Sequence, residues 1–236
     1  MSVSILRSRY FIVTLSLLSV TAIALYSGSR TTLSSPSAIA TVNFPDPKTV
    51  PSNVQGEQTV VFAGGCFWGV EAVFEHLKGV SNVVSGFAGG DAKSANYDAV
   101  SSGSTEHAEA VKITYDPTQI SYGQLLKVYF AVAHDPTQLN RQGPDSGTQY
   151  RSAVFFANSE QQQITKAYIE QLNEAKIFKG AIATQVTPLN GFYEAEEYHQ
   201  DFIDRNPAYP YVVIHDLPKL KNLQVQFPTL YKNKVR

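Results

Sequence analysis

Hydrophobic and polar positions follow two different periods along the folded part of the chain. The run QTVVFAGG, residues 58–65, is apolar and closed by glycines, which is typical of a buried strand. The apolar residues that follow fall at i, i+3, i+4 and i+7: Val70, Val73, Phe74 and Leu77. This spacing is that of one face of a helix, so the pattern predicts a strand, a glycine turn and a helix.

The same two periods predict the remaining elements. We expect strands at residues 80–90, 108–117, 149–158 and 181–189, and helices at 121–135, 159–176 and 194–206, followed by an irregular tail. The resulting order is β-α-β-β-α-β-α-β, in which neighbouring strands can pair antiparallel. It predicts an α+β fold: a two-layer α/β sandwich with a mixed, mainly antiparallel sheet and a ferredoxin-like core.

The N-terminus has a different character. Arg7 and Arg9 precede a charge-free run at residues 11–26, and Ala38 and Ala40 fit an A-x-A cleavage rule. These features are typical of a targeting segment. We therefore expect export to a periplasmic or other extracytoplasmic compartment, with the apolar run as a membrane anchor if the segment is not cleaved.

Three parts follow from this division. Residues 1–40 are expected to be a signal peptide or membrane anchor, and residues 41–56, rich in Ser, Thr and Pro, a flexible linker. Residues 57–236 would form the single folded domain, because 43% hydrophobic residues in 236 suffice for one sizeable core.

Composition excludes several classes of function. A formal net charge of −1 gives no reason to expect nucleic-acid binding. One cysteine cannot form an internal disulfide or a multi-cysteine metal site, and the five histidines lack the spacing of metal ligands. We therefore expect no cofactor and no metal.

The single cysteine, Cys66, stands where the first helix begins. A sulfur in the first turn of a helix faces unpaired N–H groups and the positive end of the dipole, which stabilise a thiolate. Gly64 and Gly65 allow a sharp turn and leave room for a second molecule. The alternative is a buried cysteine that only fills the core.

Three further features bear on that choice. Phe67 can lie on the apolar face of the predicted helix, whereas Trp68 points away from that face. An indole next to a thiol and outside the core suggests one wall of a small hydrophobic pocket; packing under a loop is the alternative. Glu109 heads the apolar face of its strand, where burial would make it a general acid, unless it leans into solvent. The loop at 134–151 holds one aliphatic residue and is either functional or disordered.

Four long motifs carry a resemblance to a known family: GGCFWGVE, GSTEHAEAVKITYDP, HDPTQLNRQGPDSGTQYRSAVFF and FYEAEEYHQDF. Together they resemble the A-type peptide-methionine (S)-S-oxide reductases. The resemblance covers residues 57–212 in order. It implies an oxidoreductase that reduces the S epimer of free and peptide-bound methionine sulfoxide, repairing oxidised proteins, and it makes residues 57–236 the catalytic domain.

The resemblance also implies residue roles. Cys66 would be the nucleophile, and Phe67 with Trp68 would hold the S-methyl group of the substrate. Four residues match the family positions that bind or protonate the sulfoxide oxygen: Tyr97, Glu109, Asp145 and Tyr150. The Cys66 thiolate would attack sulfur, Glu109 would donate a proton, and Cys66 would become a sulfenic acid.

Regeneration separates this chain from many members of that family, which use further cysteines as a relay. With one cysteine in the chain, we expect thioredoxin, glutaredoxin or a small thiol to attack the sulfenic acid directly. We expect a monomer.

Two other classes of function stay open. One is a cysteine hydrolase, since GGCFWG distantly resembles the Cys-Trp pair of papain-like enzymes. The other is a non-catalytic module that binds methionine sulfoxide or peptides.

Overall fold

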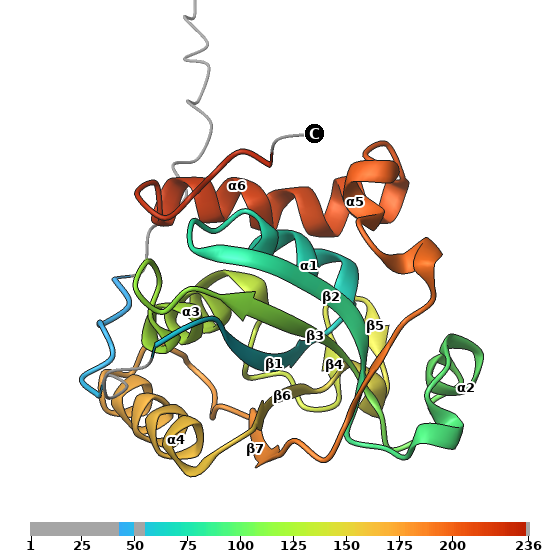
Figure 1. The fold of residues 1–236 in the computed structure, drawn as a ribbon, viewed down its shortest axis with the longest axis horizontal. Coiled ribbons are helices and arrows are strands. Elements are labelled where there is room, and N and C mark those ends of the chain that lie inside the picture. Colours follow the sequence, from blue (N-terminus) through green and yellow to red (C-terminus); the bar gives the residue numbers. More distant parts are fainter. Residues whose placement is uncertain (1–42, 50–54, 235–236) are drawn as a thin grey trace, which may run out of the picture. The chain divides into compact units, whose positions relative to one another are not determined.

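The sheet determines where the chemistry can lie. The computed structural model describes residues 43–49 and 55–234. Its main sheet has the strand order β7-β6-β1-β3-β2-β8 (Figure 1). The strands are β1 (Gln58–Gly64), β2 (Val80–Ala88), β3 (Ala108–Tyr115), β6 (Ser152–Phe156), β7 (Gln185–Pro188) and β8 (Phe192–Glu194). Only β6 and β7 pair in parallel, so the predicted mixed, mainly antiparallel sheet is confirmed.

Three helices pack on the sheet and form the second layer: α1 (Phe67–Glu75), α3 (Tyr122–Val128) and α4 (Ser159–Glu174). The main core holds side chains from all three helices and from one face of the sheet, including Phe62 of β1, Ile113 of β3 and Tyr168 of α4. The strand order β6-β1-β3-β2, with helices after β1 and β3, is that of a ferredoxin-like core. The predicted α+β sandwich is therefore confirmed.

Local sequence signals explain where these helices begin. At α3 the Ser121 hydroxyl accepts a hydrogen bond from the Gln124 backbone N–H, and the Gln124 amide oxygen accepts one from the Ser121 N–H. This capping box satisfies two N–H groups that a helix start leaves unpaired. At α4 the side-chain oxygen of the N-cap residue Asn158 accepts a hydrogen bond from the Gln161 backbone N–H. Both starts agree with the sequence-based expectation.

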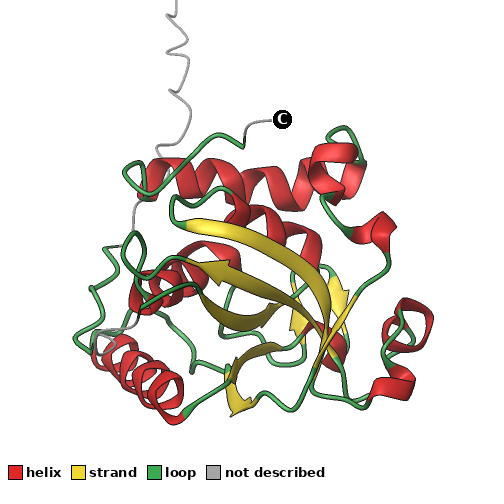
Figure 2. Cartoon of the chain, in the orientation of Figure 1, coloured by secondary structure: helices red, strands yellow, loops and turns green. Residues whose placement is uncertain are grey.

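The C-terminal part differs from the expectation of an irregular tail. Helical backbone runs from residue 210 to 226. It includes one π-helical turn at Val212–Asp216, here called the π-turn, which is followed directly by α6 (Leu217–Gln226). Figure 2 shows it as one continuous helix beside α1. The expected helix at 194–206 is in turn broken into short pieces, including α5 (Phe202–Arg205), because Asp201 takes a left-handed conformation at φ 52°.

Residues 43–49, which we expected to be part of a flexible linker, lie against the domain. Phe44 is buried, with its ring 5.7 Å from that of Phe178. The Tyr168 hydroxyl donates to the Pro45 carbonyl at 2.9 Å, and Asp46 forms an ion pair with Lys127 at 2.7 Å. One aromatic anchor and these polar contacts order a stretch whose composition favours disorder.

The expected signal peptide or membrane anchor at residues 1–40 lies outside the described residues, as does its apolar run. Within residues 43–49 and 55–234, no helix combines the length and the apolar character that a membrane span requires.

Candidate active site

Cys66 lies at the junction of β1 and α1, where the chain turns from the sheet into the helix. It is the N-cap residue of α1, as the sequence predicts, and it is buried. Gly65 makes the turn at φ 90°, and a Cβ added there would lie 2.5 Å from the side chain of Gln142. Glycine is therefore required directly before the cysteine.

Glu109 lies beside the start of α1. It is 2% exposed, and one of its carboxyl oxygens accepts a hydrogen bond from the Phe67 backbone N–H at 3.0 Å. Val111 and Ile113 of the same strand are buried in the main core, so the predicted face of β3 is confirmed. The alternative of a glutamate that leans into solvent is wrong.

Burial sets the protonation state of Glu109. Desolvation raises the pKa of this carboxyl to about 8, with a smaller contribution from the negative charge of Asp145 and an opposing one from the Phe67 N–H. The carboxyl consequently keeps its proton at neutral pH. A protonated carboxyl in a pocket is a proton donor.

The protonation state of Cys66 differs from the sequence-based expectation, which was that the start of the helix would stabilise a thiolate. Burial raises the pKa of Cys66 above its ordinary value, and the carboxylates of Glu109 and Asp216 raise it further at the high pH where both have lost their protons. The backbone N–H of Trp68 and the ammonium of Lys219 act in the opposite direction. The first turn of the helix therefore does favour the thiolate, but desolvation outweighs it.

A pocket of about 190 Å³ opens over these two groups. Its lining contains all seven residues singled out from the sequence, together with two tyrosines: Cys66, Phe67, Trp68, Tyr97, Glu109, Asp145, Tyr150, Tyr209 and Tyr211. The structure thus brings together residues from five separate segments of the chain. Tyr209 and Tyr211 were missed because the segment PAYPYVV, which follows the expected helix at 194–206, was assigned to an irregular tail.

Trp68 forms an apolar wall of this pocket. Its ring stacks on Phe202 at 3.6 Å between centroids, and its indole N–H donates to Nδ1 of His199 at 3.1 Å. The edge-on rings of Tyr209 and Tyr211 lie 6.2 and 6.0 Å away. The indole is held on all these sides, so its position against the pocket is fixed before a ligand binds.

Phenolic hydroxyls supply the polar side of the pocket. Desolvation raises the pKa of Tyr97 to about 12, and it also raises the pKa values of Tyr150 and Tyr211. All three hydroxyls therefore keep their protons and can donate hydrogen bonds. The Tyr211 hydroxyl donates to a carboxylate oxygen of Asp145. A ligand oxygen in the pocket would meet donors from several directions.

The loop at 134–151 is ordered within the described chain. It forms a small hairpin of β4 (Arg141–Gln142) and β5 (Asp145–Ser146), followed by a turn that ends at Tyr150. The hairpin presents Asp145 to the pocket. Of the two interpretations left open by the sequence, the functional one fits and disorder does not.

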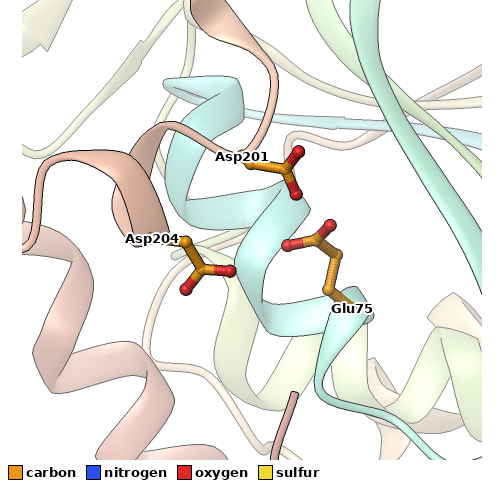
Figure 3. Close-up of side chains that lie close together, drawn as sticks. All are labelled: Glu75, Asp201 and Asp204. Atoms are coloured by element: carbon orange, nitrogen blue, oxygen red, sulfur yellow. The ribbon is translucent and has the colours of Figure 1, made fainter. Parts of the chain in front are cut away.

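One cluster of carboxylates lies outside the pocket. Glu75, Asp201 and Asp204 bring their oxygens within 4.8 Å of one another (Figure 3). Lys234 forms ion pairs with all three, at 2.8 Å to Glu75 and 3.0 Å to Asp204. The ammonium group of Lys234 thus lies where a metal ion would otherwise bind. Its ion pair with Glu75 connects the C-terminal segment to α1.

Comparisons with known proteins agree on one family. The sequence model described as "Peptide methionine sulfoxide reductase" matches residues 58–230. The chain is 56% identical over 189 residues to Peptide methionine sulfoxide reductase MsrA 2 of Mesorhizobium japonicum, covering 80% of this chain and 95% of that protein. It is 54% identical over 187 residues to MsrA 2 of Synechocystis sp., covering 78% and 87%.

Solved structures give the same result for the fold. Reduced Mxr1 from Saccharomyces cerevisiae aligns with a TM-score of 0.62 at 32% identity, over 69% of this chain and 92% of that chain. Methionine sulfoxide reductase A of Corynebacterium diphtheriae aligns with a TM-score of 0.57 at 38% identity, over 65% and 77%. Both alignments cover the larger part of each chain.

Proposed function

Because the chain belongs to the peptide methionine sulfoxide reductase family and is an oxidoreductase that reduces methionine sulfoxide, we propose that it acts on the S epimer through Cys66. The substrate is free or peptide-bound, and the reaction repairs oxidised proteins. The observation that carries the proposal is the pocket in which a buried thiol, a buried carboxyl and an aromatic wall meet.

The pocket matches the two sides of a sulfoxide. The S-methyl group packs against Phe67 and Trp68, where there is apolar surface. The oxygen points to the carboxyl of Glu109 and the hydroxyls of Tyr97 and Tyr150, which are protonated donors. Asp145 orients Tyr211 by accepting its hydrogen bond. The methyl group, the oxygen and the remaining side chain on the substrate sulfur then each have one allowed position in the pocket.

The chemical step begins with proton donation by Glu109 to the sulfoxide oxygen. This places positive charge on the substrate sulfur, next to Cys66. That charge offsets the desolvation that disfavours the thiolate, so Cys66 loses its proton as it attacks.

The step balances in atoms and electrons. The sulfur–oxygen bond of the substrate breaks and a sulfur–oxygen bond forms on Cys66. The methionine sulfur is reduced by two electrons, Cys66 is oxidised by two electrons to the sulfenic acid, and the proton that the Cys66 thiol gives up restores the carboxyl of Glu109.

Regeneration requires an external thiol, since Cys66 is the one cysteine in 236 residues. A thiolate attacks the sulfenic sulfur and releases water, giving a mixed disulfide, and a second thiol then frees Cys66. We propose thioredoxin, glutaredoxin or a small thiol as this reductant. The enzyme acts as an exported monomer whose residues 1–40 serve as signal peptide or anchor.

The rival readings of the site are less well supported. A cysteine hydrolase needs a histidine against the thiol. Among the described residues that line the pocket there is none, and the nearby His199 is bonded through Nδ1 to Trp68. An inert binding module would have no use for a protonated carboxyl beside its only thiol.

A single turnover tests the proposed intermediate. Enzyme mixed with methionine S-sulfoxide, without reductant, should release one methionine per chain and gain the mass of one oxygen at Cys66. Intact-mass spectrometry and labelling with a sulfenate-specific dione measure this. Released methionine together with an unmodified thiol would place the oxidised intermediate elsewhere.

Stereochemistry gives a second test. In the R epimer, methyl and oxygen exchange places, so the oxygen would face Phe67 or Trp68 and leave the polar donors unpaired. Consumption of racemic methionine sulfoxide with excess dithiothreitol should stop at one half, with the R epimer left, as chiral chromatography can follow. Reduction of both epimers by the pure protein would contradict the assigned places.

A further inference from the structure

Exposed apolar side chains continue outward from the pocket mouth. Six large hydrophobic residues are exposed in the described chain, and three of them lie close together in sequence: Tyr209, Val213 and Ile214. Val213 is 47% exposed and Ile214 63% exposed. We call these three residues the apolar strip.

The strip is continuous with the site. Tyr209 lines the pocket, and its ring meets the Trp68 ring edge-on. The Val213 N–H donates to the Tyr209 carbonyl at 3.0 Å, so Val213 lies one helical turn beyond Tyr209. The π-turn keeps Val212 and Asp216 buried, which leaves Val213 and Ile214 on the outer side.

The geometry of a bound substrate indicates what covers the strip. When a methionine sulfoxide side chain enters the pocket, its backbone lies at the mouth. Adjacent residues of an extended chain rise about 3.3 Å each and alternate in direction, so flanking side chains fall on the surface next to the mouth. A free amino acid would leave that surface uncovered.

Charge supports the same occupant. The segment from Asn206 to Ile214, NPAYPYVVI, contains no charged residue, so the strip offers no partner for a charged flank. We propose that the apolar strip binds the neighbours of the oxidised methionine in an extended polypeptide, and thereby favours substrates with an apolar residue beside the sulfoxide. This rests on the function proposed above and names its substrate class.

The test compares three substrates with dithiothreitol as reductant: acetyl-Leu-Met(O)-Leu-amide, acetyl-Ser-Met(O)-Ser-amide and free methionine S-sulfoxide. The unaltered enzyme should show a higher kcat/KM for the leucine peptide than for the serine peptide. Val213→Ser combined with Ile214→Ser should lower kcat/KM for the leucine peptide about tenfold, because two half-exposed aliphatic side chains lose their contact. The serine peptide and the free amino acid should be unaffected.

A matched control lies on the same helix. Val225 is 45% exposed and stands three turns further along, so Val225→Ser removes a comparable apolar side chain away from the mouth. It should change none of the three values. Unchanged turnover of the free sulfoxide shows in the same experiment that the variants are folded and that the proposed reaction is intact.

Two results would overturn the inference. One is a double variant that keeps the leucine preference, or a control variant that loses it equally. The other is a loss that occurs only when thioredoxin replaces dithiothreitol, since the strip would then bind the reductant. Failure of the proposed function is distinct from both, because it would abolish turnover of free methionine sulfoxide in the unaltered enzyme.

Discussion

Replacing Cys66 by serine should abolish the reduction of methionine sulfoxide, to below one part in ten thousand of the unaltered rate. A serine hydroxyl is far less nucleophilic than a thiolate and cannot accept oxygen as a sulfenic acid does. No other cysteine is present to take over. Release of methionine with excess dithiothreitol, measured by chromatography, checks this.

The same variant should still bind substrate, because serine leaves the pocket walls in place. Trp68, the only tryptophan, lines that pocket, so its fluorescence reports both folding and binding without a label. We expect a fluorescence change on adding methionine S-sulfoxide to Cys66→Ser, with no turnover. Measurable turnover in this variant would remove Cys66 from the mechanism.

Replacing Glu109 by glutamine should slow the single-turnover release of methionine by about 10²- to 10⁴-fold, the usual contribution of a general acid. Glutamine keeps the size and can still accept the Phe67 N–H bond, but it has no carboxyl proton to give. Rapid-quench measurement of methionine release isolates this step from regeneration by thiol.

The pH dependence follows from the direction of the shift. Burial raises the pKa of Glu109 to about 8, so its acid form is present below that pH and is lost as the pH rises through it. The unaltered enzyme should therefore slow above about pH 8 in single turnover. Glu109→Gln, which cannot ionise, should lack this fall.

The chain offers a matched control for this variant. Glu71 is also buried, and burial raises its pKa to about 8, but it accepts the Asp201 N–H at 3.1 Å outside the pocket. Glu71→Gln should stay within twofold of the unaltered rate. If Glu109→Gln does so as well, Glu109 is not the acid.

Much of this site could be predicted because its parts lie on regular elements. Alternation along β3 places Glu109 on the buried face, and the glycine turn after β1 places Cys66 at the start of α1. Both are consequences of local periodicity. The predicted role of Tyr97, by contrast, came from the family resemblance alone.

Two features of the structure do not follow from the regular periods of the sequence. The helix at 210–226 was missed because its π-turn, Val212–Asp216, breaks the i, i+3, i+4 spacing on which helix prediction rests, and because prolines stand at 210 and 218. The protonated state of Cys66 was missed for a different reason, because it depends on contacts between segments that are distant in sequence. Burial in the assembled pocket, helped by Asp216, outweighs the local effect of the helix start.

The late position of this helix in the chain also bears on how the protein is made. The four strands of the ferredoxin-like core are complete at Phe156, whereas Tyr209 and Tyr211 leave the ribosome more than fifty residues later. Domains generally fold as units, so the pocket is incomplete until the segment that carries these two tyrosines has been made. The thiol therefore stands at the end of β1 without its final cover while the chain is still growing. Oxidants reach an accessible thiol more readily than a buried one, so Cys66 is less protected before the last helix packs on α1 than in the finished fold, where it is buried.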